Sequence, residues 1–192
     1  WGALVKARAG EEHHGVDDSD SWHLFWGDGG ADDCADPADI NQGDANDCWL
    51  LSAMMIAAAR DDENKTSRII KNLFARYSQN VDPSTIDSSL DLHVVRFYRP
   101  DIGKWEHVVI DSAVPVREPA KGMPPGLLRP KYACSREPET WVMLLEKAYT
   151  KWTSSRAKAS GNPNPYENIN FGLIDEALVS FTGGVKSLIA LD

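Results

Sequence analysis

The dense run from Cys48 to Ala57, within a segment from Asn46 to about Arg60, constrains the fold of this chain more than any other part. Ser52 is its only polar residue. On a helix, its apolar side chains would cover nearly the whole circumference, and a helix of that kind is buried. Asn46 is a residue type that favours the N-cap position. The sequence therefore predicts a central, buried helix that begins at Cys48.

This helix start would bring a thiol close to an amide. A cysteine at a helix N-terminus lies where unpaired backbone N–H groups and the helix dipole favour a negative charge. Gln42, six residues earlier, can reach the same place and donate a hydrogen bond to a developing oxyanion. Acyl transfer by a cysteine also requires a general base. Because free cysteines are often buried as small apolar residues, the pair alone does not fix a role for Cys48.

Composition excludes several kinds of partner. The chain has 192 residues, enough for one core, so we expect a single domain or one lobe of a larger one. Its net charge of −9, with dispersed Lys and Arg, argues against nucleic acid or an anionic membrane. No apolar run is long enough for a membrane span. The three cysteines form no CxxC pair, which disfavours a zinc knuckle or a disulfide framework and favours an intracellular, cytoplasmic compartment.

The remaining patterns predict an α+β chain that is mostly helical. Apolar residues recur at helical spacing in three further segments and at period two in two segments that flank a turn at 101–104. Residues 1–38 are expected to be irregular, and the proline-rich stretch 114–138 is expected to be a long loop. The predicted elements are helices at 66–77, 140–152 and 174–181, the last ending at Gly183, and a β-hairpin formed by strands within 90–97 and 105–110.

Three motifs resemble the calpain family of cysteine proteases. QGDANDCWLL at 42–51 is similar to the family's active-site signature, WVMLLEKAYTKW at 141–152 resembles the helix that follows it, and EALVSFTGGV at 176–185 resembles the segment that closes the first half of the protease core. The motifs occur in family order, and the resemblance covers 22–187. It implies the first, cysteine-bearing lobe of a papain-like core, preceded by an arm or linker at 1–21 and followed at 188–192 by the connection to a second lobe.

The resemblance also implies roles for individual residues. Cys48 matches the nucleophile, and Gln42 matches the glutamine of the oxyanion hole. Asp39 and Glu139 match carboxylates that bind calcium in this lobe of calpains, and calcium takes several oxygen ligands in a flexible geometry. For both carboxylates the alternative is a helix cap or a solvated side chain.

The chain departs from the family pattern around the cysteine. Ala45 and Asn46 stand where calpains have Leu-Gly, and Asp44 adds a charge that opposes a thiolate nearby. The segment expected after the helix at 141–152 is replaced by a longer stretch at 154–171. The glycine-rich loop that supplies calcium ligands in calpains has no clear match between residues 29 and 37.

No histidine of the chain matches the catalytic histidine of calpains, which belongs to the second lobe. His93 and His107 fall in predicted strands, where we expect packing roles, and His13, His14 and His23 lie in the first 38 residues. We therefore expect the cysteine-bearing lobe of a calcium-dependent intracellular endopeptidase that acts on protein or peptide substrates and is inactive without its second lobe. The alternative is a non-catalytic calpain-like structural or interaction module within a larger protein assembly.

Overall fold

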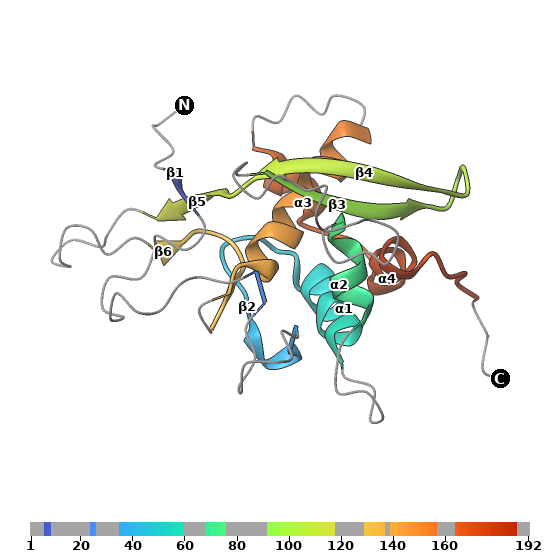
Figure 1. The fold of residues 1–192 in the computed structure, drawn as a ribbon, viewed down its shortest axis with the longest axis horizontal. Helices are drawn as coiled ribbons and strands as arrows, with labels where there is room; N and C mark the ends of the chain where they lie inside the picture. The colour runs from blue at the N-terminus through green and yellow to red at the C-terminus, as the bar shows by residue number, and fades with distance from the viewer. Residues whose placement is uncertain are drawn as a thin grey trace, which may run out of the picture.

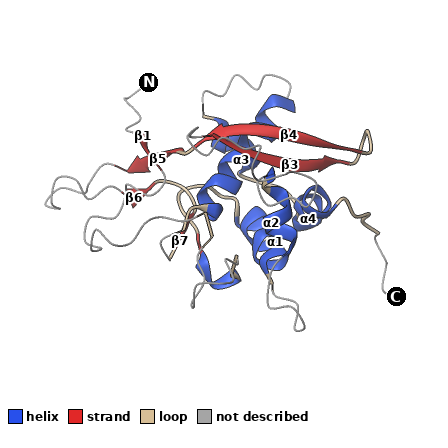
Figure 2. Cartoon of the chain, in the orientation of Figure 1, coloured by secondary structure: helices blue, strands red, loops and turns tan. Residues whose placement is uncertain are grey.

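The computed structural model describes residues 6–8, 24–25, 35–59, 68–75, 92–117, 129–136, 139–156 and 164–187. Within these ranges, helices pack against a long β-hairpin, and shorter strands lie to one side (Figures 1 and 2). This arrangement confirms the predicted α+β class with small antiparallel sheets. The helices are α1 (Cys48–Ala58), α2 (Arg68–Leu73), α3 (Trp141–Arg156) and α4 (Ile174–Thr182), with 3-10 helices η1 (Pro37–Asp39) and η4 (Pro165–Ile169).

Helix α1 begins at Cys48, as the sequence predicts, but its N-cap residue is Asp47 rather than Asn46. The Asp47 carbonyl accepts the N–H groups of Leu50 and Leu51 at 2.8 and 3.1 Å. Its carboxyl makes no capping hydrogen bond and is fully buried. The Asn46 N–H instead donates to Oδ1 of Asn170 at 3.1 Å. The N-cap prediction was one residue early because Asn46 is held by a distant segment that its local sequence does not show.

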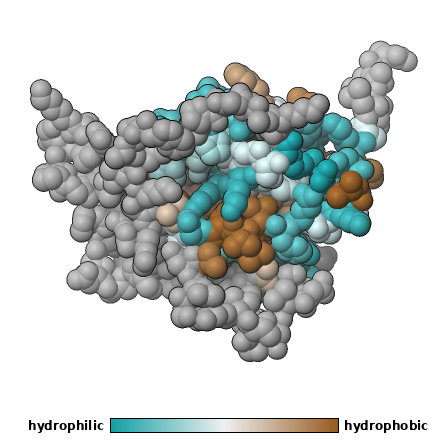
Figure 3. Space-filling view, turned by 90° about the horizontal axis from the view of Figure 1, so that it is seen from above, coloured by the Kyte–Doolittle hydropathy of each residue, from teal (hydrophilic) through white to brown (hydrophobic). Residues whose placement is uncertain are grey.

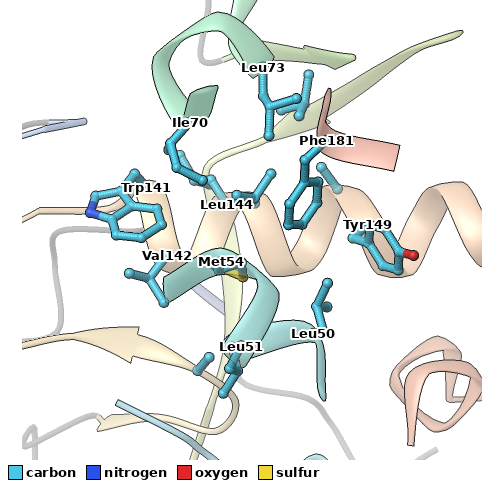
Figure 4. Packing of buried hydrophobic residues seen from close by; sticks show 14 of the residues in the cluster. Leu50, Leu51, Met54, Ile70, Leu73, Trp141, Val142, Leu144, Tyr149 and Phe181 are labelled. Carbon is cyan, nitrogen blue, oxygen red and sulfur yellow. The ribbon is translucent and has the colours of Figure 1, made fainter. Parts of the chain in front are cut away.

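One broad face of α1 is buried, and the opposite face is not. Met55 and Ile56 are 41% and 53% exposed. The composition of the helix predicts burial on all sides, and this prediction was wrong for the face that carries these two residues. The buried side chains contact α2 and α4 and contribute to the main core (Figure 4). They are Leu50, Leu51, Ala53, Met54, Ala57 and Ala58.

Helix α3 is the most deeply buried element and carries the centre of the core. Its Tyr149 ring packs against Phe97 of the β-hairpin and Phe181 of α4, with ring centroids 5.3 and 5.9 Å away. Figure 4 shows Phe181 and Leu144 pointing into the same space. Burying a side chain of this size contributes about 1.5–3 kcal/mol. The helices predicted at 140–152 and 174–181 are present as α3 and α4. Helix α4 is capped at its C-terminus by Gly183, which has a φ of 71°.

The predicted hairpin is present as β3 (Leu92–Arg99) and β4 (Lys104–Asp111), paired antiparallel over eight positions from Leu92↔Asp111 to Arg99↔Lys104. The predicted helix at 66–77 is shorter in the part of the chain that the structure describes. Helix α2 ends at Leu73 because Phe74 forms a β-bridge with Val95 of the hairpin. Residues 66–67 and 76–77 lie outside the described ranges.

Short strands occur where the sequence predicts irregular chain. A three-stranded sheet has the order β1 (Lys6–Arg8), β5 (Ala113–Arg117), β6 (Arg129–Pro130), and in a two-stranded sheet β2 (Ile40–Asn41) pairs with β7 (Cys134–Ser135). Strands of two to five residues are too short, and here too rich in proline, to show a period-two pattern. The irregular prediction for 1–38 was wrong at β1, and the loop prediction for 114–138 was wrong at β5, β6 and β7. Strand β2 lies between these two segments, outside both predictions.

Candidate active site

The loop that leads into α1 is fixed by its backbone. The Asp44 N–H donates to the Lys131 carbonyl at 2.9 Å, and Gly43 lies directly on the backbone of Tyr132. A Cβ atom on Gly43 would overlap the Tyr132 carbonyl group, so only glycine fits this close approach. The Gln-Gly pair of the signature therefore has a structural reason: the glycine anchors the loop whose two ends carry Gln42 and Cys48.

Cys48 lies at the first position of α1 with its thiol exposed. No hydrogen bond to its sulfur is formed within the described residues. The first N–H groups of a helix have no partner inside the helix, so they place partial positive charge around this sulfur. An accessible thiol in that environment can act as a nucleophile once a base removes its proton.

Gln42 is exposed at the other end of the loop. Its Nε2 donates to the Ala45 carbonyl at 3.0 Å, which holds the amide over the turn that precedes α1. An amide nitrogen carries two hydrogens, so one remains for a substrate oxygen after this bond is made. Ala45 is buried, and its carbonyl is used in this way, so the departure at 45–46 is accommodated without a glycine.

Asp47, the residue before Cys48, forms a buried acidic pair with Glu146 of α3. The sequence alone did not predict this pair. Asp47 is 0% exposed and Glu146 of α3 is 1% exposed. Burial is the main cause that raises the pKa of both carboxyls, and the neighbouring Asp47 charge raises that of Glu146 further, well above its ordinary range. The sequence signal for Glu146 was weak, because its helical neighbours Val142 and Tyr149 are apolar or aromatic but it lies away from the face that carries Trp141 and Leu145.

The far side of α1's first turn is covered by the segment that follows η4. The Trp49 indole Nε1 donates to the Ile169 carbonyl at 2.8 Å, and Gly172 lies against the same indole ring. Beside it opens a cavity of about 530 Å³, whose lining includes Trp49, Phe171 and Val185. The end of the stretch that departs from the family pattern therefore lies along the candidate site.

The two predicted calcium ligands lie at one corner of the molecule. Oδ2 of Asp39 accepts the Asp36 N–H at 2.9 Å, so this side chain caps η1, as the alternative prediction has it. Oε1 of Glu139 accepts from Ser135 Oγ and Trp141 Nε1 at 2.8 and 2.7 Å. The β2–β7 pairing links the residues, since Ile40 lies opposite Ser135. Within the described residues, no three His, Cys, Asp or Glu side chains gather as a metal-binding group.

The remaining residues singled out from the sequence are Asp44, the histidines and Cys34. Oδ1 of Asp44 forms an ion pair with Arg117, which offsets its charge near the cysteine. His93 lies within hydrogen-bond distance of Ser112, with 2.9 Å between Nε2 and Oγ, and His107 is exposed on β4. The remaining histidines and Cys34 lie outside the described residues.

An exposed thiol at a helix start, with an amide at the other end of a rigid loop, is the arrangement that the nucleophile half of a cysteine hydrolase site requires. Residues 22–192 match the model of the calpain family of cysteine proteases. The chain therefore belongs to the calpain family, as its three motifs predict.

Relatives support the same assignment. The chain is 32% identical over 169 residues to the calpain-type cysteine protease DEK1 of Arabidopsis thaliana, a match that covers 88% of this chain and 6% of that protein. It is 31% identical over 156 residues to human calpain-14, with 80% and 18% covered. It is also 31% identical over 153 residues to calpain clp-1 of Caenorhabditis elegans, with 80% and 16% covered. The chain thus spans less than a fifth of each of these relatives. Among the helices that the structure describes, none combines the length and apolar character needed to cross a membrane.

Proposed function

We propose that this chain is the cysteine-bearing lobe of a calpain-type endopeptidase that cleaves proteins. The observation that carries the proposal is the exposed Cys48 thiol at the start of a helix whose other side is packed into the core. The thiolate would attack the scissile carbonyl carbon and form the C–S bond. The Gln42 amide and the Cys48 N–H would donate to the resulting oxyanion, and the amine would leave with a proton from the general base.

The base would come from a second lobe of the same protein. Neither described histidine contacts Cys48, so the chain alone would not turn over substrate. The surface beside Trp49 supports such a lobe, because Phe171 and Val185, which line the cavity, are 87% and fully exposed. Large apolar side chains that gather on a surface indicate an interface. In the view of Figure 3, a compact group of apolar atoms reaches the surface beside polar residues.

We propose that Asp39 and Glu139 hold calcium in the assembled enzyme. Both are buried carboxylates at the β2–β7 corner, and carboxylate and carbonyl oxygens suit a hard cation. The bound ion would supply positive charge that draws this corner together and would thereby couple calcium to assembly of the site. Calorimetric titration of the full protein with Ca²⁺ should show binding that Glu139→Gln weakens at least tenfold. Identical isotherms would remove Glu139 from the site.

The proposed activity is tested by comparing the full-length protein with the present chain. Full-length protein should hydrolyse casein, Cys48→Ser should abolish that hydrolysis, and Cys134→Ser should leave it unchanged. The chain alone should be inactive in the same assay. A full-length protein that shows no hydrolysis, while Cys48 still reacts with iodoacetamide, would support the alternative of a calpain-like structural module.

A further inference from the structure

We propose that Asp47 and Glu146 form a carboxyl pair that shares one proton and positions the start of α1, and with it Cys48. The pair would be a positioning device, since neither side chain reaches the surface where a substrate would bind. The inference rests on the proposed role of Cys48 as nucleophile. Its test uses thiol alkylation and unfolding, so it can fail or succeed independently of proteolysis.

The geometry of the pair requires a proton. Glu146 accepts the Ala133 N–H on both oxygens, at 3.2 and 3.1 Å. Neither Asp47 oxygen has an N–H or hydroxyl partner at full hydrogen-bond geometry among the described residues, although the Gln42 amide lies close to this carboxyl. The carboxyl that faces Asp47 is that of Glu146. Two buried carboxylates in contact cannot both be charged, so one of them must donate its O–H to the other.

Among the residues that the structure describes, no cation offsets a second charge on this pair. Of these residues, Tyr166 faces the pair, and the Tyr166 ring stacks on that of Tyr132 with centroids 3.6 Å apart. Burial and the charge of Glu146 raise the pKa of Tyr166 well above its usual value, so it stays neutral. Lys131 lies over the Tyr132 ring rather than on a carboxylate. The Gln42 amide is the remaining polar side chain that faces Asp47.

One negative charge suits this place, and two do not. A single carboxylate at Asp47 lies at the N-terminus of α1, where the helix dipole stabilises it. Loss of the shared proton would put two charges in an apolar interior and push the carboxyls apart. Because Asp47 is covalently joined to Cys48 and faces Gln42, that displacement would move both parts of the candidate site.

Glu146→Gln is the sharpest variant. Its amide would donate to Asp47 while its carbonyl still accepts the Ala133 N–H, so it imitates the protonated glutamic acid and has no proton to lose. Glu176→Gln, on the exposed side of α4, is the matched control. Asp47→Asn provides a second variant, because its amide can donate to Glu146.

The experiment follows two quantities on the present chain from pH 5 to pH 9. Alkylation of Cys48 by iodoacetamide is measured on its own peptide by mass spectrometry, and stability is measured by urea unfolding. A carboxyl whose pKa is raised by folding stabilises the fold below the ordinary carboxyl pKa, and this stability is lost as pH rises toward the folded pKa. Each pKa unit corresponds to about a tenfold change in the unfolding constant.

Between pH 5 and pH 9 the unfolding constant should rise in the wild type and in the Glu176→Gln control. This rise should be at least about tenfold larger than the rise in Glu146→Gln. The alkylation profiles of the wild type and the control should show a second inflection besides that of the thiol, and Glu146→Gln should show one alone. Superimposable profiles of wild type and Glu146→Gln in both measurements would overturn the proposal. If Glu146→Gln does not fold, Asp47→Asn decides by the same comparison.

Discussion

The indole Nε1 of Trp49 donates a 2.8 Å hydrogen bond to the carbonyl of Ile169, which lies 120 positions later in the chain. This bond joins the residue after the candidate nucleophile to the last residue of η4. Gly172 lies against the other part of the same ring, so the indole is held between a hydrogen bond and a backbone contact. The first turn of α1 therefore depends on a segment that is remote in sequence.

Trp49→Phe should destabilise the chain by about 1–3 kcal/mol, because it removes the donor and leaves the buried Ile169 carbonyl without this partner. Trp105→Phe is the control, since Arg96 lies over that half-buried ring and Tyr98 meets it edge-on. Urea unfolding at pH 7 gives both differences. Equal losses for the two variants would show that ring size, and not the hydrogen bond, sets the effect.

Three glycine-to-alanine substitutions should fall in a fixed order of severity. In Gly43→Ala the new Cβ meets the Tyr132 backbone, which cannot move without breaking the loop. In Gly172→Ala it meets the Trp49 ring at 2.5 Å, and a side chain can shift. In Gly184→Ala it meets only the Thr182 hydroxyl at 3.1 Å. Overpacking costs about 1–3 kcal/mol, and for a chain of this size each kcal/mol lowers Tm by about 2–4 °C.

Thermal unfolding therefore should rank Gly43→Ala as the most destabilised variant, Gly172→Ala second and Gly184→Ala near the wild type. A Gly43→Ala variant with unchanged Tm would contradict the close approach between the loop and Tyr132.

The sequence indicates those elements whose signal is local. The apolar periodicities around Leu144 and Ala177 predict α3 and α4, and the turn at Gly103 predicts the hairpin. The three motifs identify the family. The pairs that complete the site are not local, since Asp47 meets Glu146 and Trp49 meets Ile169 only after the chain has folded. Neither a hydrophobic pattern nor a capping rule relates residues so far apart.

The Asp44 charge near Cys48 is balanced by its ion pair with Arg117. Removing either partner should therefore change the reactivity of the Cys48 thiol only slightly, and in opposite directions for the two partners. Asp44→Asn leaves Arg117 unpaired and should speed alkylation of Cys48 at pH 7, whereas Arg117→Ala leaves Asp44 unpaired and should slow it. Both side chains are largely exposed, so each change should stay within about threefold and shrink in 0.5 M salt. Rates that change in the same direction for both variants would exclude this electrostatic account.

Glu106 should give the chain a pH dependence opposite to that expected from Glu146. Its carboxyl accepts from Arg99 and from the Trp152 indole, both at 2.8 Å, and the bond from Arg99 is the main cause that lowers its pKa. A lowered pKa stabilises the fold above the ordinary carboxyl range, and that stability is lost as pH falls through the folded pKa. Glu106→Gln should therefore be less stable than wild type at pH 7, and the gap should close toward pH 3. A gap in urea unfolding that stays constant from pH 7 to pH 3 would show that the loss is one of packing and not of charge.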